Sequence, residues 1–277
     1  MGVEGWVYYN HAAIPLCAPH ETPNLKPIET GEIWKMEGSP LFARWTTDFD
    51  CEEKTNWWYN IKQAPFVIEE LPSRSRKHIR QAQRKCYVKK IDPTENIEAL
   101  YQCYWAAFRQ YENAMNEVSY EKFKENCEAD QRKGLEYWAG YAADNDQLIG
   151  YMIVQTYADY AELRVAKFLP ERRNCMVSDA LYVAVLEEYL NRQMKNYISS
   201  GTRSINHKTN TEEYKISNFA YKRAYCKLNI CYNPKIKWIV KILYLFRGIL
   251  ARLDKISQIH RINAVLKMEE IVRNEEQ

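Results

Sequence analysis

Apolar residues recur along most of the chain with one of two periods, one typical of helices and one of strands. The clearest helical stretch begins at Thr94 and places a row of large apolar side chains on one face. These side chains are Ile97, Leu100, Tyr101, Tyr104, Phe108 and Tyr111. Ser73 and Ser119 are expected to cap two more helices, which end near Arg84 and Gly134. Two further helices are expected at 178–194 and 211–219.

Short apolar runs bounded by polar turns predict the strands. They lie at 86–91, 137–143, 147–157, 160–168, 197–205 and 224–232. The links at 144–146 and 158–159 are so short that the three strands they join must form an antiparallel meander. The pattern therefore predicts an α/β (α+β) fold, with a mixed, mostly antiparallel sheet flanked by helices.

The two ends of the chain differ from this regular middle. Prolines at 15, 19, 23 and 27 exclude a helix, and the first 72 residues contain only short strand-like runs. We expect residues 1–72 to form a β-rich arm that packs on a main domain at 73–233. Residues 234–277 read as a two-helix extension.

Composition limits the partners and the cellular location that can be expected. The formal net charge of +3 is too small to imply a polyanionic partner by itself. The eight cysteines form no C-x-x-C pair, which indicates reduced thiols. No apolar run approaches the roughly 20 residues of a membrane span, and no secretory signal is evident. We expect a cytoplasmic protein that is at most peripheral to the inner face of a membrane.

The element order and four segments of the sequence resemble those of known acyltransferases. The element order over about 86–232 is that of the GNAT fold, and PSRSRKHIRQAQRKCYVKKI resembles the basic opening helix and strand of FemABX-type proteins, which are built on that fold. SNFAYKRAYCKLNI resembles a segment with a Gly-Phe pair before the last strand, although Ala220-Tyr221 stand there instead. NHAAIPLCAPHE and LFARWTTDFDCEEKTNWWYNIK resemble acyltransferases found among bacterial surface-polysaccharide proteins.

The resemblance implies a cofactor site. In a GNAT fold the strands corresponding to 160–168 and 197–205 splay apart around the pantetheine arm of acyl-CoA. The pyrophosphate then binds at the start of the next helix, where free N–H groups favour anions. The residues at that place are Arg172, Arg173, Asn174 and Ser178. The usual glycine-rich loop is absent, and an ordinary solvated turn is the alternative interpretation.

Transfer of an acyl group to an amine requires a base. His207 follows the strand expected to border the splay, so it is the first candidate, although it could instead only cap the next helix. Glu162 is a second candidate base or base-orienting group, and Tyr225 is the candidate acid. Thr209 and Asn210, in the same loop as His207, are expected to contact the acceptor.

Two other regions are candidates for acceptor binding. His11, His20 and Glu21 lie in the proline-rich arm, where His11, His20 and Cys17 are too loosely spaced for a metal site. The stretch between Glu70 and Asp92 contains eight Lys or Arg residues and no acid. Arg80 and Arg84 in this block are expected to hold a phosphorylated group, unless the block is only a solvated helix.

The tail combines apolar residues with lysine and arginine over 234–255. Basic amphipathic helices of this kind lie at anionic membrane surfaces, but they also cover cores or dimer interfaces.

These observations predict an N- or O-acyltransferase that uses acyl-CoA, with acetyl-CoA as the first donor to consider, and no metal. The acceptor is a small or lipid-linked molecule, such as a cell-surface glycan precursor. The alternatives are an aminoacyl-tRNA-dependent transferase of the FemABX type, the one case that involves nucleic acid, and a non-catalytic polysaccharide-assembly protein at the membrane.

Overall fold

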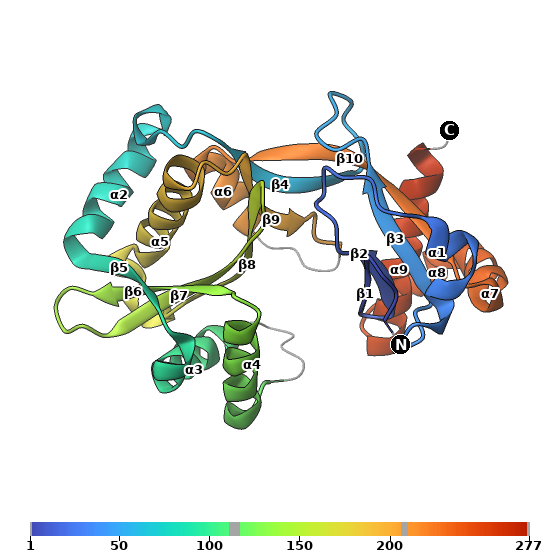
Figure 1. Ribbon diagram of the computed structural model, residues 1–277, viewed down its shortest axis with the longest axis horizontal. Helices are drawn as coiled ribbons and strands as arrows, with labels where there is room; N and C mark the ends of the chain where they lie inside the picture. The colour runs from blue at the N-terminus through green and yellow to red at the C-terminus, as the bar shows by residue number, and fades with distance from the viewer. Residues whose placement is uncertain (1, 111–116, 206–209, 276–277) are drawn as a thin grey trace. The chain divides into compact units, whose positions relative to one another are not determined.

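A computed structural model describes residues 2–110, 117–205 and 210–275 (Figure 1). The chain divides into two compact units. The central unit comprises Asn60–Gly201 and Asn210–Lys222, and the terminal unit comprises Met1–Tyr59, Thr202–Thr209 and Arg223–Gln277. The expected arm and the expected tail therefore both contribute to the terminal unit.

The sheet of the central unit follows the predicted meander. Its strands lie in the order β9-β8-β7-β6-β5, and all neighbours are antiparallel except β8 and β9, which are parallel. The bounds are β5 (Cys86–Ile91), β6 (Glu136–Ala142), β7 (Leu148–Thr156), β8 (Tyr160–Phe168) and β9 (Tyr197–Thr202). The predicted fold class, a mixed and mostly antiparallel sheet flanked by helices, is confirmed.

Helices cover both faces of this sheet because its strands alternate two sets of apolar side chains. On β7, Met152 and Val154 pack in one core and Tyr151 and Ile153 in another. The first core takes side chains from α2 (Ser73–Lys85), α5 (Val177–Leu186) and α6 (Thr211–Phe219). The second takes them from α3 (Ile97–Phe108) and α4 (Tyr120–Arg132), which lie across the sheet from α5 (Figure 1).

Local capping fixes several element ends. The Ser119 hydroxyl accepts the Lys122 N–H at 3.2 Å, which confirms the predicted cap of α4. The helix expected from Thr94 begins later, because the Asp92 carboxylate accepts the Thr94 N–H and hydroxyl. The short connecting helices are η2 (Ile68–Glu70), η3 (Pro93–Glu95), η4 (Pro170–Cys175) and the π-helical η5 (Glu187–Arg192).

The terminal unit combines the two ends of the chain and contains two clusters of buried hydrophobic residues. Its strands β1 (Trp6–Tyr9), β2 (Ala12–Pro15), β3 (Phe42–Thr47) and β10 (Lys222–Tyr232) follow one another in that order, and β4 (Trp57–Gln63) contributes residues to both units. Phe42 and Trp57 from the arm pack with Leu228, Met268 and Ile271. The unit also contains α1 (Lys26–Glu29) and η1 (Glu32–Lys35).

The tail forms three helices where two were expected. They are α7 (Pro234–Leu245), α8 (Arg247–Arg252) and α9 (Ser257–Glu275). The break occurs at Phe246, whose backbone (φ −99°, ψ 9°) leaves the helical region. Within the ranges that the structure describes, no helix has both the length and the apolar character needed to cross a bilayer.

Candidate functional site

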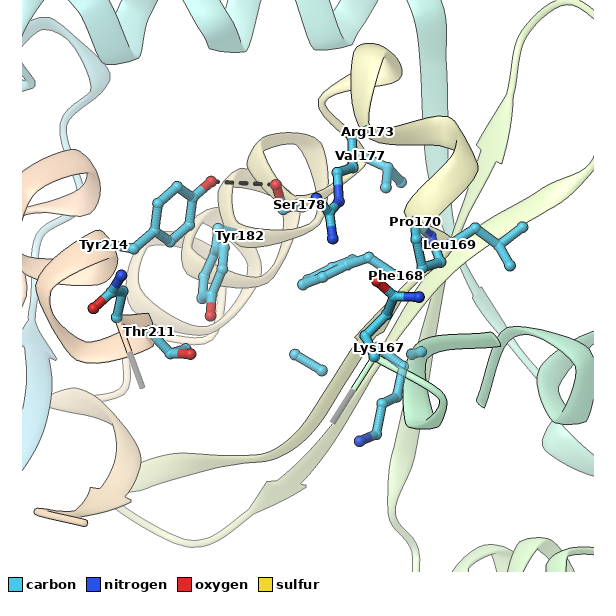
Figure 2. Close-up of a pocket in the computed structure, with 14 residues that line it drawn as sticks. Lys167, Phe168, Leu169, Pro170, Arg173, Val177, Ser178, Tyr182, Thr211 and Tyr214 are labelled. Atoms are coloured by element: carbon cyan, nitrogen blue, oxygen red, sulfur yellow. Dashed lines mark hydrogen bonds between the residues drawn. The ribbon is translucent and has the colours of Figure 1, made fainter. Parts of the chain in front are cut away.

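Strands β8 and β9 are paired over only part of their length. The register runs from Tyr160↔Tyr197 to Glu162↔Ser199, while β8 continues to Phe168. A bulge lies just beyond this point, because Leu163 and Val165 pair with consecutive residues of β7 and Arg164 is skipped. Bulges re-aim a strand and are common beside functional sites. The end of β8 therefore leaves β9 and lines a cavity instead (Figure 2).

The cavity has a volume of about 690 Å³ and lies within the central unit. Its walls come from the ends of α3 and β8, from η4, and from the starts of α5 and α6 (Figure 2). The lining residues are Ala107, Gln110, Ala166, Lys167, Phe168, Leu169, Pro170, Arg173, Val177, Ser178, Tyr182, Asn210, Thr211 and Tyr214. This described lining contains two cations and no acid, so it favours an anionic ligand with an apolar portion.

Two glycines allow α5 to begin against the sheet. Gly140 and Gly150 are register partners on β6 and β7. A Cβ on Gly140 would lie 2.4 Å from Val177 Cγ2, and one on Gly150 would lie 2.9 Å from Phe168 Cδ1 and 3.2 Å from Val177 Cγ1. Only glycine tolerates this approach, since a distance under 3 Å is a steric clash. The pair thus sets the position of two residues, Val177 and Phe168, that line the cavity.

The turn that leads into α5 is held by neighbouring elements. Lys85 of α2 donates to the Asn174 carbonyl at 2.9 Å, and the Arg172 guanidinium binds Asp144 at 2.8 Å. Met176 precedes the helix in the left-handed region (φ 56°, ψ 34°), a conformation that glycine adopts more readily. The turn is therefore fixed by side chains and by one strained residue, in place of the glycine-rich loop that the sequence lacks.

A chain of hydroxyl groups connects the cavity wall to a buried carboxylate. The Ser178 hydroxyl lies 3.2 Å from the Tyr214 hydroxyl (Figure 2). It also donates to the Asp179 carboxylate at 3.2 Å. Burial raises the pKa of Asp179 above its ordinary value, against the opposing effect of hydrogen bonds from Tyr214 and Ser178. Burial also raises the pKa of Tyr214, so this phenol keeps its proton at neutral pH. A protonated phenol next to such a carboxylate can both give and relay a proton.

The predicted site residues of the central unit fall in different places. Arg173, Ser178 and Asn210 line the cavity, and Arg173 makes no ion pair within the described ranges. Arg172 is bound to Asp144 and to Asn145 of the β6–β7 turn. Asn174 is exposed and presents its carbonyl to Lys85.

The remaining predicted residues of this unit lie on β8 and α2. Glu162 belongs to the last register pair with β9 and forms an ion pair with Arg164, also on β8, at 3.7 Å. Arg80 and Arg84 are exposed on α2.

Other predicted residues cannot be assigned to the cavity. His207 and Thr209 lie outside the described residues. His11, His20, Glu21 and Tyr225 belong to the terminal unit. There the His11 ring contacts the Tyr8 hydroxyl at 3.2 Å, and the Glu21 carboxylate accepts the Ala18 N–H at 2.9 Å. The rings of His20 and Tyr225 pack against Phe49 and Trp58.

Several lining residues were not identified from sequence. Lys167 stands next to the last residue of β8, a position that could have been chosen once that strand was assigned to the splay. Tyr182 and Tyr214 are spaced like ordinary apolar positions of α5 and α6, and nothing in the sequence brings Tyr214 to Ser178. The paired glycines were a usable signal, since an isolated glycine inside a strand often marks a close approach.

Comparison with known proteins identifies the architecture. No family model and no curated protein sequence matches the chain. Among solved structures, FemX is similar with a TM-score of 0.53 at 7% identity, over 72% of this chain and 74% of that chain. L-PGS from Bacillus licheniformis gives 0.50 at 9% identity, over 86% and 82%. A tandem GNAT protein from the clavulanic acid biosynthesis pathway gives 0.49 at 9% identity, over 80% and 75%. At these identities the likeness is one of fold alone, and the two structures with a TM-score of at least 0.50, FemX and L-PGS, share the fold of this chain.

Proposed function

We propose that this protein is a GNAT-type acyltransferase that binds acyl-CoA in the central-unit cavity and transfers the acyl group to an amine or hydroxyl. The observation that carries the proposal is the cavity itself, which opens where β8 leaves β9, at the start of α5. Acetyl-CoA is the first donor to test, and a cell-surface glycan precursor is the acceptor class that the sequence resemblance favours.

The lining fits the parts of such a donor. Arg173 and Lys167 can bind phosphate oxygens, and a helix N-terminus adds free N–H groups and a favourable dipole. Ala166, Phe168 and Val177 offer an apolar wall for the pantetheine chain. When bound, acyl-CoA would supply an acyl group already activated as a thioester.

Side chains of the protein would then donate a proton to the leaving group and remove one from the acceptor. Tyr214 holds a proton in the cavity wall, and Ser178 connects it to Asp179. We assign Tyr214 the role of proton donor to the leaving group, with Asp179 behind it as the relay. The base that accepts the acceptor's proton is still predicted to be His207, with Glu162 as the second candidate.

A matched pair of adjacent arginines tests the donor site. Arg173→Ala should weaken CoA binding by about tenfold or more, since one charge-assisted phosphate contact contributes roughly 1.5–3 kcal/mol. Arg172→Ala should change CoA affinity little, because its guanidinium is engaged by Asp144. Isothermal titration calorimetry with CoA and acetyl-CoA measures both. Equal losses in the two variants, or no binding to the wild type, would overturn the proposed donor site.

Catalytic roles need a separate measurement of turnover. His207→Gln should lower kcat by about 10²–10⁴-fold with CoA affinity unchanged, since glutamine keeps hydrogen bonding but has no basicity. Tyr214→Phe should lower kcat and leave CoA affinity intact. Wild-type turnover in His207→Gln would move the base to Glu162.

The second candidate donor is an aminoacyl-tRNA, the donor implied by the FemABX resemblance. Exposed basic residues on α2, including Arg80 and Arg84, provide a surface that could bind its phosphates. Tight, salt-sensitive binding of aminoacyl-tRNA, together with no affinity for CoA, would favour this donor. Arg80→Ala with Arg84→Ala should then weaken tRNA binding without lowering the melting temperature, because exposed like charges contribute little to stability.

A further inference from the structure

The tail presents a row of large apolar side chains to solvent on α7 and α8. We call the row formed by Trp238, Ile239, Ile242, Leu245, Phe246 and Ile249 the α7–α8 stripe. Every member is at least half exposed, and Trp238 and Leu245 are 70% and 76% exposed. Trp238, Ile239, Ile242 and Leu245 are spaced three, four and seven residues apart and lie on one side of α7, and Phe246 and Ile249 follow at the break and in α8. Isolated exposed apolar residues are ordinary, but a contiguous row marks an interaction surface.

The opposite side of these helices already packs within the terminal unit. Val240 is buried, and the Arg273 guanidinium of α9 lies 4.1 Å from the centre of the Tyr244 ring. The Asn263 side chain of α9 donates to the Leu250 carbonyl at 3.0 Å. The helices are thus held on α9 by one side, and the α7–α8 stripe is the side left for a partner outside the unit.

The charges beside the stripe identify the partner chemistry. Residues 234–253 contain three lysines, two arginines and no acid. Lys241 reaches back over the Trp238 ring at 4.9 Å, so a cation and an aromatic face stand together at the edge of the stripe. A helix with Trp, Phe and Leu on one side and Lys or Arg at its borders inserts its apolar side at the headgroup level of a membrane with anionic lipids.

We infer that the α7–α8 stripe docks the protein on an anionic membrane surface. The helices lie in the interface without crossing it, with Trp238, Leu245 and Ile249 inserted and the lysines and arginines among the headgroups. Arg247 is paired with Glu270 of α9 at 3.5 Å. A protein surface would require acidic partners for the other four cations, whereas an anionic bilayer supplies negative charge and apolar volume together. This inference does not depend on the proposed transferase activity.

Vesicle co-sedimentation of the full chain tests the inference. The wild type should bind phosphatidylcholine vesicles containing one quarter phosphatidylglycerol at least about tenfold more tightly than pure phosphatidylcholine vesicles. Trp238→Ser/Leu245→Ser/Ile249→Ser should lose most binding to both. Lys237→Gln/Lys241→Gln/Arg252→Gln should lose the preference for the anionic vesicles. Leu16→Ser, which changes a side chain 59% exposed outside the stripe, should bind like the wild type.

Two further measurements keep the test decisive if the triple serine variant does not fold. Brominated lipids in the vesicles should quench the tryptophan fluorescence of the wild type, which needs no substitution. Analytical ultracentrifugation without vesicles should give a monomer for the wild type. A dimer that the serine variant converts to monomer, with no vesicle binding, would assign the stripe to a second copy of the chain. Equal wild-type binding to neutral and anionic vesicles would also overturn the inference.

Discussion

Helices α5 and α7 have similar amounts of apolar side chain but opposite environments. In α5 the residues Leu181, Val185 and Leu186 are fully buried. In α7 the residues Trp238 and Leu245 are mostly exposed. The difference lies in what each helix packs against. Helix α5 packs against a sheet that has two glycines at the contact. Helix α7 packs on α9 with only one of its sides.

This contrast shows that an apolar pattern predicts a helix and a face, but not the burial of that face. Burial depends on surfaces contributed by other parts of the chain. The unpartnered face of α7 is then available for function, while the buried face of α5 holds the cavity in shape. Substitutions that are chemically equal should therefore have different effects in the two units.

The largest difference is expected for leucine truncation. Leu181→Ala in α5 should lower the free energy of unfolding by about 2–5 kcal/mol, because it removes a fully buried side chain and leaves a void. Leu245→Ala in α7 should change it by less than about 0.5 kcal/mol. Urea unfolding measured by fluorescence compares the two, and equal losses would mean that the α7 face is covered.

A smaller contrast concerns lysine. Lys215 on α6 is buried, and its ammonium donates to the Ser200 hydroxyl at 2.6 Å. Burial lowers its pKa from 10.5 to about 8. Lys215→Met should raise the free energy of unfolding at pH 7 by about 2 kcal/mol, since a shift of one pKa unit corresponds to about 1.4 kcal/mol and the lost hydrogen bond offsets part. Lys237→Met on exposed α7 should change it little.

The same lysine makes stability depend on pH. Between pH 8 and 10.5 the unfolded chain binds more protons at Lys215 than the folded chain does, so wild-type stability should rise with pH across this window. Lys215→Met removes this rise, and its advantage over the wild type should shrink as the pH approaches 10.5. An advantage that is independent of pH would show that the lysine is not neutralised by burial.

The smallest contrast compares one substitution at two exposed alanines. Ala220 ends α6 in the left-handed region (φ 53°, ψ 37°), where a side chain costs about 1 kcal/mol relative to glycine. Ala220→Gly should therefore stabilise the protein by about that amount. Ala251→Gly, in the helical conformation of α8, should destabilise by roughly 0.5–1 kcal/mol. Thermal unfolding measures both, and the same sign in the two variants would contradict the backbone argument.

Much of the fold was predictable because local signals agreed with each other. Ser119 followed by Glu121 is a strong helix start, and the meander strands were separated by links too short for anything but hairpins. Prediction was less accurate where two residues close together in the sequence could both cap the same helix. Asp92 and Thr94 are both good caps, and only the structure shows that Asp92 binds Thr94 and delays α3. The replacement of the expected Gly-Phe pair by Ala220 changes little, because Ala220 adopts the conformation that glycine would have taken.

The site was less accessible to sequence analysis for the same reason. Arg172 and Arg173 are equivalent in sequence, and Asp144, in a turn far away along the chain, decides which of them remains for a ligand. The contact between Ser178 and Tyr214 joins two helices that are separated by a strand. The pattern of the tail favoured a core or a dimer interface over a membrane surface, and only the structure shows that side chains of α7 are exposed.

The glycine pair on β6 and β7 controls the shape of the cavity from outside its lining. Gly140 and Gly150 are not among the lining residues, yet they determine how close Val177 comes to the sheet. The absence of a Cβ at both glycines thus sets the depth of the cavity. A methyl group at Gly140 would displace Val177 and one at Gly150 would displace Phe168, so a substitution at either glycine would change the shape of the cavity without altering any residue that lines it.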